Sequence, residues 1–283
     1  EANEAAIKLA RKYGQLNGGS NRKTIVTLES SFHGRTLATL TATGQTKFHP
    51  ECFEPYPSGF KTIKANDFEC LDSAFDDTTA ALFIECVQGE GGVNILDKEW
   101  VQAAAAAARK AGAIVMVDEV QTGIGRTGTL LASSTFDIDA EVVTLAKGIA
   151  GGVPMGVCLF KGKANKVFVA GDHQSTFAGN PLACAAGCVV LDTVSDKNFL
   201  DEVVKKGEYI RNTIKSWEIP FVKEVRGKGL MIGIQLDSSV KPFDVEVECL
   251  NQGLCTTVAG SDVVRFLPPL NISYKEIDEG LAI

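Results

Sequence analysis

The stretch from Ala113 to Lys147 constrains the fold most strongly. It contains two apolar runs, Ala113–Val117 and Val142–Ala146, which are rich in β-branched residues and therefore predict buried parallel strands. Asp118 and Glu119 follow the first run, and Lys147 follows the second. Ligands bind at the carboxyl ends of the strands in an open α/β sheet. The sequence therefore predicts a site where these carboxylates and this amine meet.

A lysine beside an acid at such an edge suggests one specific chemistry. A partly desolvated lysine loses its proton more easily and can react with a carbonyl group. Pyridoxal phosphate needs such a lysine, together with a carboxylate that holds a proton on the pyridine nitrogen. The alternative is an ordinary surface lysine with an acid that caps a loop. Lys147 and Asp118 alone favour that alternative, because both arrangements are common.

A glycine pattern in the same stretch points to a different cofactor. Gly123, Gly125 and Gly128 form G-x-G-x-x-G after a strand, which resembles the dinucleotide-binding fingerprint of nicotinamide-dependent dehydrogenases. Five residues, two of them acidic, separate this strand from the first glycine, so the tight turn of that fingerprint is missing. The residues that follow do not begin a clean amphipathic helix. We therefore expect a loop or a turn here.

Composition and charge exclude several classes of function. The chain has 283 residues, of which 45% are hydrophobic and 22% charged, with a net charge of −7 and a pI near 5.1. The lack of a basic cluster argues against nucleic acids or anionic membranes as partners. No apolar run is long enough to span a bilayer, and no signal-peptide pattern begins the chain. The eight cysteines form no C-x-x-C pair, and the three histidines are not spaced near them as zinc ligands would be, which predicts free thiols in the cytoplasm and no metal site.

The order of strands and helices predicts an α/β fold with a mostly parallel sheet. Residues 1–191 form a predicted large cofactor-binding domain, with strands at 24–28, 80–87, 113–117, 142–146 and 155–160 and helices at 1–13, 67–75, 98–111 and from Pro181 onwards. Residues 192–283 form a predicted smaller C-terminal α+β domain, with strands at 221–225, 231–236, 254–258 and 263–266. A capping box, Ser273–Glu276, begins its last helix. Both ends look cut, so we expect an internal fragment of a longer protein.

Seven motifs in one order give the chain a strong family resemblance. They are EANEAAIKLARKY, SFHGRTLATLTATGQ, ECVQGEGG, VDEVQTGIGRTG, LAKGIAGGVPMG, STFAGNPLACAA and VRGKGLMIGIQL. They resemble motifs of the class III pyridoxal-phosphate aminotransferases, and the resemblance is collinear and covers essentially the whole chain. The resemblance implies the type I, aspartate aminotransferase-like fold and pyridoxal 5′-phosphate as the cofactor.

The resemblance also implies roles for individual cofactor residues. Lys147 matches the lysine that binds the cofactor covalently and moves the proton, and Asp118 matches the partner of the pyridine nitrogen. Gln121 matches the residue beside the phenolic oxygen, and Phe32 matches the aromatic residue that stacks on the ring. Thr176 matches a phosphate ligand that the neighbouring subunit supplies, which implies a homodimer with shared active sites. The predicted cofactor-binding residues are Phe32, Asp118, Glu119, Val120, Gln121, Lys147 and Thr176.

Four further residues match substrate contacts of the family. Arg35 resembles the arginine that binds a substrate carboxylate, for which a planar guanidinium is suited, and an exposed loop arginine is the alternative. Ser175 matches a neighbouring substrate contact. Arg265 resembles the arginine that binds the α-carboxylate of glutamate, and Glu90 resembles its ion-pair partner. We expect a movable Glu90 to mask Arg265 from the first substrate and to release it for the second, because an unpaired buried charge is costly.

The function that the resemblance implies is transfer of the δ-amino group of N2-acetylornithine to 2-oxoglutarate. The products are N-acetylglutamate 5-semialdehyde and glutamate, in a step of arginine biosynthesis. Succinylornithine, 4-aminobutyrate and ornithine are alternative donors, and a non-catalytic protein that keeps the fold is an alternative of another class. Gln174 and Ala178 stand where the family has glycine, Cys86 stands where it has proline, and its phosphate loop would lie upstream of Glu1.

Overall fold

The computed structural model describes residues 1–283 and divides them into two compact units. The first unit contains Glu1–Cys86, Leu96–Gln121 and Ser133–Leu191. The second contains Val87–Ile95, Thr122–Ala132 and Asp192–Ile283. The division into domains 1–191 and 192–283 stays a prediction. In the structure, two short segments from within the first range pack with the second unit.

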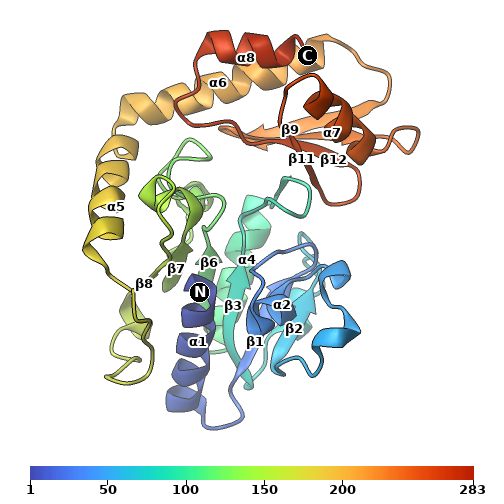
Figure 1. The fold of residues 1–283 in the computed structure, drawn as a ribbon. Coiled ribbons are helices and arrows are strands. Elements are labelled where there is room, and N and C mark those ends of the chain that lie inside the picture. The colour runs from blue at the N-terminus through green and yellow to red at the C-terminus, as the bar shows by residue number, and fades with distance from the viewer. The chain divides into compact units, whose positions relative to one another are not determined.

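A six-stranded sheet forms the centre of the first unit (Figure 1). Its strands, in spatial order, are β2 (Phe60–Ile63), β1 (Thr24–Leu28), β3 (Thr79–Ile84), β6 (Ile114–Asp118), β7 (Val142–Leu145) and β8 (Val157–Phe160). Neighbouring strands are parallel from β2 to β7, and only the edge strand β8 is antiparallel to its neighbour. The predicted α/β fold with a mostly parallel sheet is therefore confirmed.

Helices cover both faces of this sheet, because its central strands are apolar on both sides. Leu82 of β3 and Val115 of β6 pack with the alanine-rich helix α4 (Lys98–Lys110), whereas Phe83 and Met116 pack with α1 (Ala2–Gly18) on the other face. Successive residues of a strand point to opposite faces, so a continuous apolar run can fill two cores. The other helices and 3-10 turns of the chain before α5 are α2 (Leu37–Ala42), α3 (Leu71–Ala74), η1 (Thr46–Phe48), η2 (Glu51–Phe53), η3 (Ala132–Phe136), η4 (Lys147–Ala150) and η5 (Gly162–Ala164).

The second unit is built on an antiparallel sheet. Its strands, in spatial order, are β11 (Thr257–Ala259), β12 (Val263–Phe266), β10 (Met231–Leu236) and β9 (Val222–Lys228). Three helices belong to this unit, α6 (Lys197–Ser216), α7 (Pro242–Asn251) and α8 (Tyr274–Leu281), and α5 (Pro181–Val194) precedes them in the chain. A small hairpin of β4 (Val87–Gln88) and β5 (Asn94–Ile95) completes the unit.

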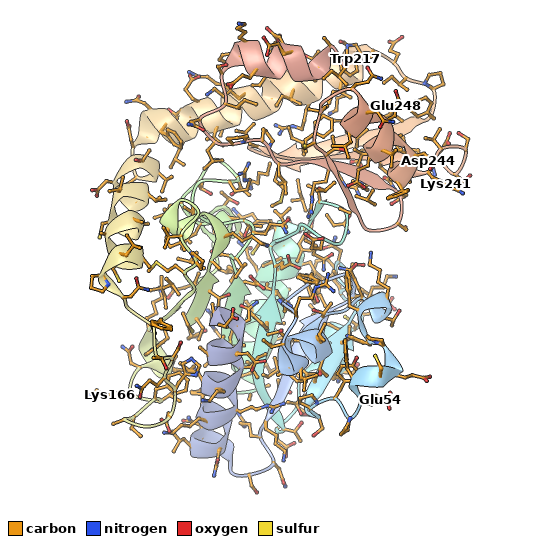
Figure 2. The ribbon with its side chains drawn as sticks, viewed as in Figure 1. Glu54, Lys166, Trp217, Lys241, Asp244 and Glu248 are labelled. Atoms are coloured by element: carbon orange, nitrogen blue, oxygen red, sulfur yellow. The ribbon has the colours of Figure 1, made fainter.

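Charged side chains lie at the surface of both units and point away from the ribbon. Those labelled in Figure 2 are Glu54, Lys166, Lys241, Asp244 and Glu248, and all of them are exposed. Apolar side chains fill the cores instead, with Trp100 and Phe83 among the largest that are fully buried. No helix combines the length and the hydropathy that crossing a membrane requires.

Most predicted elements are confirmed, and their ends have local causes. Asp97 accepts a hydrogen bond from the backbone of Trp100 at the start of α4, which is the predicted N-cap, and the predicted capping box of Ser273 and Glu276 begins α8. The prediction of one strand over 80–87 is wrong in its extent. The strand β3 ends at Ile84, and Val87–Gln88 forms a separate strand that pairs with β5 in the other unit.

The G-x-G-x-x-G segment forms consecutive turns, as expected, and no α-helix follows it. Gly125 and Gly128 have φ values of 85° and 88°, which favour glycine. Gly128 also lies against α6, where an added Cβ would lie 2.3 Å from Cγ2 of Val204. The glycines therefore shape a tight loop against a helix within the second unit. The nicotinamide alternative, which rested on this pattern alone, loses its support.

Gly128→Ala should therefore destabilise the protein by two independent effects. A positive φ costs a residue with a side chain about 1–2 kcal/mol, and overpacking against the stiff Val204 adds about 1–3 kcal/mol. Gly253→Ala is the matched control, since Gly253 has a φ of 96° but nothing within 4 Å of an added Cβ. We expect the Gly128 variant to melt at a clearly lower temperature than the control in a thermal unfolding experiment. Equal losses would refute the close packing.

Candidate active site

Two neighbouring strands of the first unit deliver the two predicted catalytic residues. Strands β6 and β7 are parallel, and Asp118 at the end of β6 pairs in register with Thr144 of β7. Lys147 follows β7 after one intervening residue, at the start of the turn η4. Asp118 and Lys147 line one cavity of about 1150 Å³. The expected meeting of acid and amine at the carboxyl edge of the sheet is therefore observed.

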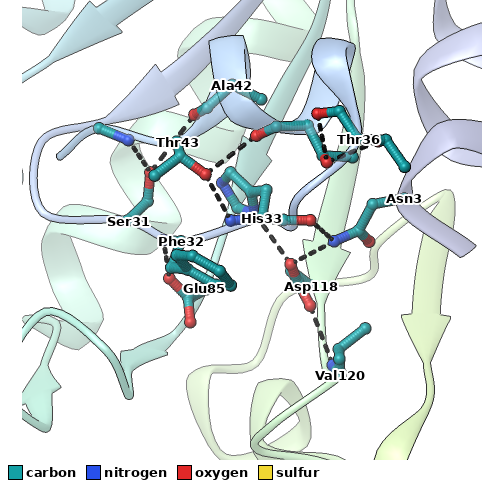
Figure 3. A network of polar contacts seen from close by, with 12 residues as sticks. Asn3, Ser31, Phe32, His33, Thr36, Ala42, Thr43, Glu85, Asp118 and Val120 are labelled. Atoms are coloured by element: carbon teal, nitrogen blue, oxygen red, sulfur yellow. Dashed lines mark hydrogen bonds and ion pairs between the residues drawn. The ribbon is translucent and has the colours of Figure 1, made fainter. Parts of the chain in front are cut away.

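The Asp118 carboxylate is buried, with 3% of the residue exposed, and three hydrogen bonds hold it (Figure 3). Its Oδ2 accepts from Asn3 Nδ2 at 2.7 Å and from His33 Nδ1 at 2.8 Å. Its Oδ1 accepts from the backbone N–H of Val120 at 2.9 Å. A carboxylate offers about four lone-pair sites. One site therefore remains for a fourth donor from the cavity, such as a protonated pyridine nitrogen.

His33 is held as firmly as the carboxylate that it contacts. Its ring stacks on Phe83 with 4.2 Å between centroids and an interplanar angle of 17°. Its backbone N–H donates to Thr43 Oγ1 at 2.9 Å, and its carbonyl accepts from Asn3 Nδ2 at 2.6 Å. Nδ1 must carry the hydrogen, because an ionised carboxylate can only accept, and the buried Nε2 has no partner. One tautomer and one ring orientation are therefore fixed.

Sequence reasoning missed both His33 and Asn3. Both residues lie within the quoted motifs, next to Phe32 and inside EANEAA, but their spacing carries no sign of a shared partner. Asn3 lies 115 positions from Asp118, and His33 lies 85 positions from it. Only the folded sheet brings them together. Conservation of both positions in an alignment of relatives is the signal that could reveal them.

Lys147 adopts an unusual backbone conformation. Its φ is 51°, which is rare for a residue with a side chain, and Gly151 ends the following turn in the left-handed region. Strained backbone of this kind clusters at functional sites. The side chain is exposed at the cavity, so the partial desolvation suggested by the sequence is not observed. The amine is accessible to a ligand in the cavity.

Phe32 and Arg35 line the same cavity from the loop after β1. The backbone N–H of Phe32 donates to Oε2 of the buried Glu85 at 2.9 Å. The guanidinium carbon of Arg35 lies 5.3 Å from the ring centroid of Phe32 and 4.6 Å from that of Phe48. Such cation–π contacts restrain an arginine that is exposed. The two aromatic rings therefore restrain Arg35, and its guanidinium remains exposed at the cavity.

The remaining predicted residues of the first unit divide into two groups. Val120, Gln121 and Ser175 line the cavity, whereas Glu119 and Thr176 do not. The buried Glu119 carboxylate accepts from the backbone of Ser133 at 2.7 Å, so it holds a neighbouring turn. Thr176 is exposed in the loop before α5. Their predicted part in cofactor binding stays a prediction.

The departures from the family pattern lie in different surroundings. Ala178 lines the cavity, Gln174 is exposed, and Cys86 is fully buried beside α4. Cys158, unlike Cys86, lines the cavity, and burial raises the pKa of its thiol to about 11. Cys158 therefore stays protonated at neutral pH and is unsuited to act as a nucleophile. Lys147 is the amine that this cavity offers.

Glu90 and Arg265 form the expected ion pair within the second unit. Arg265 Nη1 lies 2.8 Å from Glu90 Oε1, with 6% of the arginine side chain and 28% of the glutamate side chain exposed. Arg265 Nε also donates to Thr257 Oγ1 at 3.2 Å. A buried guanidinium held by one carboxylate is suited to exchange that carboxylate for one from a ligand. The pairing is confirmed, and its role with a substrate stays a prediction.

These side chains fit the ring of pyridoxal phosphate. Asp118 has one remaining acceptor site, Lys147 presents an amine, and Phe32 presents an aromatic ring to one cavity. Together they match the two needs of this cofactor besides phosphate binding. No group of three or more His, Cys, Asp or Glu residues is placed to hold a metal ion.

Comparison with known proteins gives consistent results over the whole chain. The family model for class III aminotransferases matches residues 1–283. The acetylornithine aminotransferase of Caldanaerobacter subterraneus subsp. tengcongensis is 45% identical over 285 residues, which cover 100% of this chain and 72% of that protein. The acetylornithine aminotransferase of Aquifex aeolicus is 42% identical over 283 residues, which cover 100% of this chain and 73% of that protein.

Solved structures agree in fold. The ornithine aminotransferase from Toxoplasma gondii superposes with a TM-score of 0.93 at 30% identity, over 99% of this chain and 68% of that chain. The N-acetylornithine aminotransferase from Stenotrophomonas maltophilia superposes with a TM-score of 0.83 at 32% identity, over 99% of this chain and 70% of that chain. These relatives are named for two different substrates, acetylornithine and ornithine.

Asp118→Asn should weaken the binding of pyridoxal phosphate. The amide would present N–H groups to the three donors that now surround the carboxylate, and it carries no charge to stabilise a protonated pyridine. We expect at least a tenfold rise in the dissociation constant, about 1.4 kcal/mol, in an absorbance titration with the cofactor. Asp139→Asn, at a side chain that is 83% exposed, is the matched control and should bind as the unmodified protein does. Unchanged affinity in the Asp118 variant would contradict the assignment.

Proposed function

The chain belongs to the class III aminotransferase family, and we propose that it transfers the δ-amino group of N2-acetylornithine to 2-oxoglutarate. The products are N-acetylglutamate 5-semialdehyde and glutamate, and the cofactor is pyridoxal 5′-phosphate. One observation carries the proposal: Lys147 and the anchored Asp118 line the same cavity at the carboxyl ends of β7 and β6. The reaction belongs to arginine biosynthesis.

The residues of the chain divide the chemical work. Lys147 would hold the cofactor through Nζ, and its amine would then carry a proton from one carbon to another. Asp118 would hold a proton at the pyridine nitrogen, since it lines the cavity and three hydrogen bonds leave it one acceptor site. Phe32 would stack on the ring. Bound pyridoxal phosphate supplies an electron sink for the pair left when a C–H bond of the substrate breaks.

The choice of N2-acetylornithine rests on the relatives. Two acetylornithine aminotransferases share 45% and 42% of their residues with this chain over its full length. Succinylornithine, 4-aminobutyrate and ornithine are rival donors, since discrimination among them is a matter of pocket shape. Ala178 lines the cavity where the family has glycine, so this wall is where a different donor preference would arise.

Substrate carboxylates would be bound by arginines. Arg35 at the cavity, with Ser175 beside it on the cavity wall, is proposed for a carboxylate of the substrate. Arg265 is proposed for the α-carboxylate of glutamate, with Glu90 as its mask in the other half-reaction. Glu90 would leave Arg265 only when the α-carboxylate of glutamate takes its place, so the guanidinium keeps a carboxylate partner throughout.

A second copy of this chain is the proposed partner. Phe177, Leu182 and Val189 are 79%, 71% and 67% exposed, in α5 and the loop before it. Large exposed apolar side chains on one helix and the loop before it support a protein–protein interface at this segment. Thr176 lies in the same loop, which supports its proposed contribution to the active site of the partner subunit. The proposed homodimer thus shares its active sites.

The cytoplasm is the proposed location. All eight cysteines are free, and Cys86 is fully buried. Scattered free thiols without pairing partners are typical of reducing compartments.

A visible absorbance spectrum of the purified protein tests the proposed reaction. We expect a yellow band with pyridoxal phosphate, bleached by N2-acetylornithine and restored by 2-oxoglutarate. Lys147→Ala should lose the band, whereas Lys163→Ala, at an exposed lysine in η5, should keep it. A band that ignores N2-acetylornithine would keep the enzyme class and exclude this donor. Absence of any band would favour the non-catalytic alternative.

Glu90→Ala should make α-amino substrates react better. Without its partner, Arg265 would be permanently available for an α-carboxylate. We expect the ratio of kcat/KM for L-glutamate to kcat/KM for N2-acetylornithine to rise about tenfold, which corresponds to about 1.4 kcal/mol. Glu224→Gln, at an exposed glutamate of the same unit, should leave the ratio unchanged. An unchanged ratio in the Glu90 variant would contradict the masking role.

A further inference from the structure

The loop that carries Glu90 is clamped by one arginine of β9. This loop, residues 89–93, joins β4 to β5 within the second unit. Arg226 Nε donates to the carbonyls of Gly92 at 3.1 Å and Val93 at 3.2 Å. Its Nη2 donates to the Gly92 carbonyl at 2.7 Å and to Asn94 Oδ1 at 3.1 Å. One guanidinium thus makes three hydrogen bonds to the loop and a fourth to the first residue of β5.

Hydrogen bonds and packing by other residues also hold the loop. The carbonyl of Glu90 accepts from the backbone N–H of Gly260 at 2.8 Å, and the carbonyl of Gly91 accepts from Asn94 Nδ2 at 2.9 Å. Val93 is fully buried with a φ of 55°. Gly233 of β10 leaves the space that Val93 fills, since a Cβ there would lie 3.0 Å from Cβ of Val93. The backbone is therefore held at Glu90 and at the three residues that follow it.

We propose that Arg226 is a positioning residue that sets substrate selectivity by holding the Glu90 backbone within reach of Arg265. The proposal rests on the masking role of Glu90 described above. With the backbone clamped, Glu90 can pair with Arg265 or leave it only by rotation of its side chain. The selectivity of the mask then depends on the clamp, because a loop that moves would carry the Glu90 carboxylate away from Arg265 and open the guanidinium to any α-carboxylate.

A purely structural role for Arg226 is the competing explanation. Its Nη1 also contacts Glu224 Oε2 at 2.7 Å and Gln235 Oε1 at 2.8 Å, which ties β9 to β10. Loss of that tie would destabilise the sheet and lower both half-reactions together. A positioning role instead changes their ratio, and only when Glu90 is present. A double-mutant cycle separates the two explanations.

The experiment uses Arg226→Lys and Arg226→Gln, alone and combined with Glu90→Ala. Lysine keeps the charge but cannot reproduce the planar fork, so it covers the case in which the glutamine variant fails to fold. Glu224→Gln is the matched control, since it removes one partner of Arg226 and leaves the loop contacts in place. Amide hydrogen exchange of residues 89–94 reports the clamp directly, and kcat/KM for L-glutamate against N2-acetylornithine reports selectivity.

We expect faster exchange of residues 89–94 in both Arg226 variants and a rise of threefold or more in the glutamate to N2-acetylornithine ratio. In the Glu90→Ala background the same substitutions should leave that ratio unchanged within twofold. Unaltered exchange, or an equal effect in both backgrounds, would overturn the positioning role. A Glu90→Ala variant with a normal ratio would instead overturn the masking role itself, and the positioning role with it.

Discussion

The anchored carboxylate of Asp118 is the interaction on which the rest of the site depends. Asn3, His33 and Val120 donate to it from three separate segments, so its orientation is fixed before any ligand binds. A buried carboxylate is costly unless it is hydrogen-bonded, and these donors satisfy it. They leave it one acceptor site for a ligand in the cavity that it lines. Preorganisation of this kind lowers the cost of stabilising charge during a reaction.

The sheet explains why these donors can be so precisely placed. Phe83, on which His33 stacks, belongs to the fully buried strand β3, and Asp118 ends its neighbour β6. Asn3 comes from α1, whose apolar side packs on the same face of the sheet as Phe83. A close-packed core transmits little positional freedom to the groups attached to it. The strands that bury the core therefore also position the donors, and stability and chemistry share one framework.

Local patterns were sufficient to predict five of the six strands of the main sheet, because those strands are apolar runs, whereas the partly exposed edge strand β2 was missed. Asp97 and Ser273 are predicted caps that the structure confirms. The pattern failed where pairing depends on distant residues, as at Val87–Gln88, which leaves the main sheet to pair with β5. Strand ends raised the roles of Lys147 and Asp118 as one possibility, and the family resemblance was needed to favour them. The Glu90–Arg265 pair, 175 positions apart, came only from that resemblance.

Residues that act through other residues leave the weakest trace in a sequence. His33 and Arg226 carry no pattern of their own, and each becomes meaningful only through the group that it orients. The two differ in what they hold. His33 fixes a side chain that must not move, since Asp118 has to present one acceptor site. Arg226 fixes a backbone so that the Glu90 side chain can move while its origin stays in place. A carboxylate that serves as a switch therefore needs a rigid base as much as a carboxylate that serves as an anchor does.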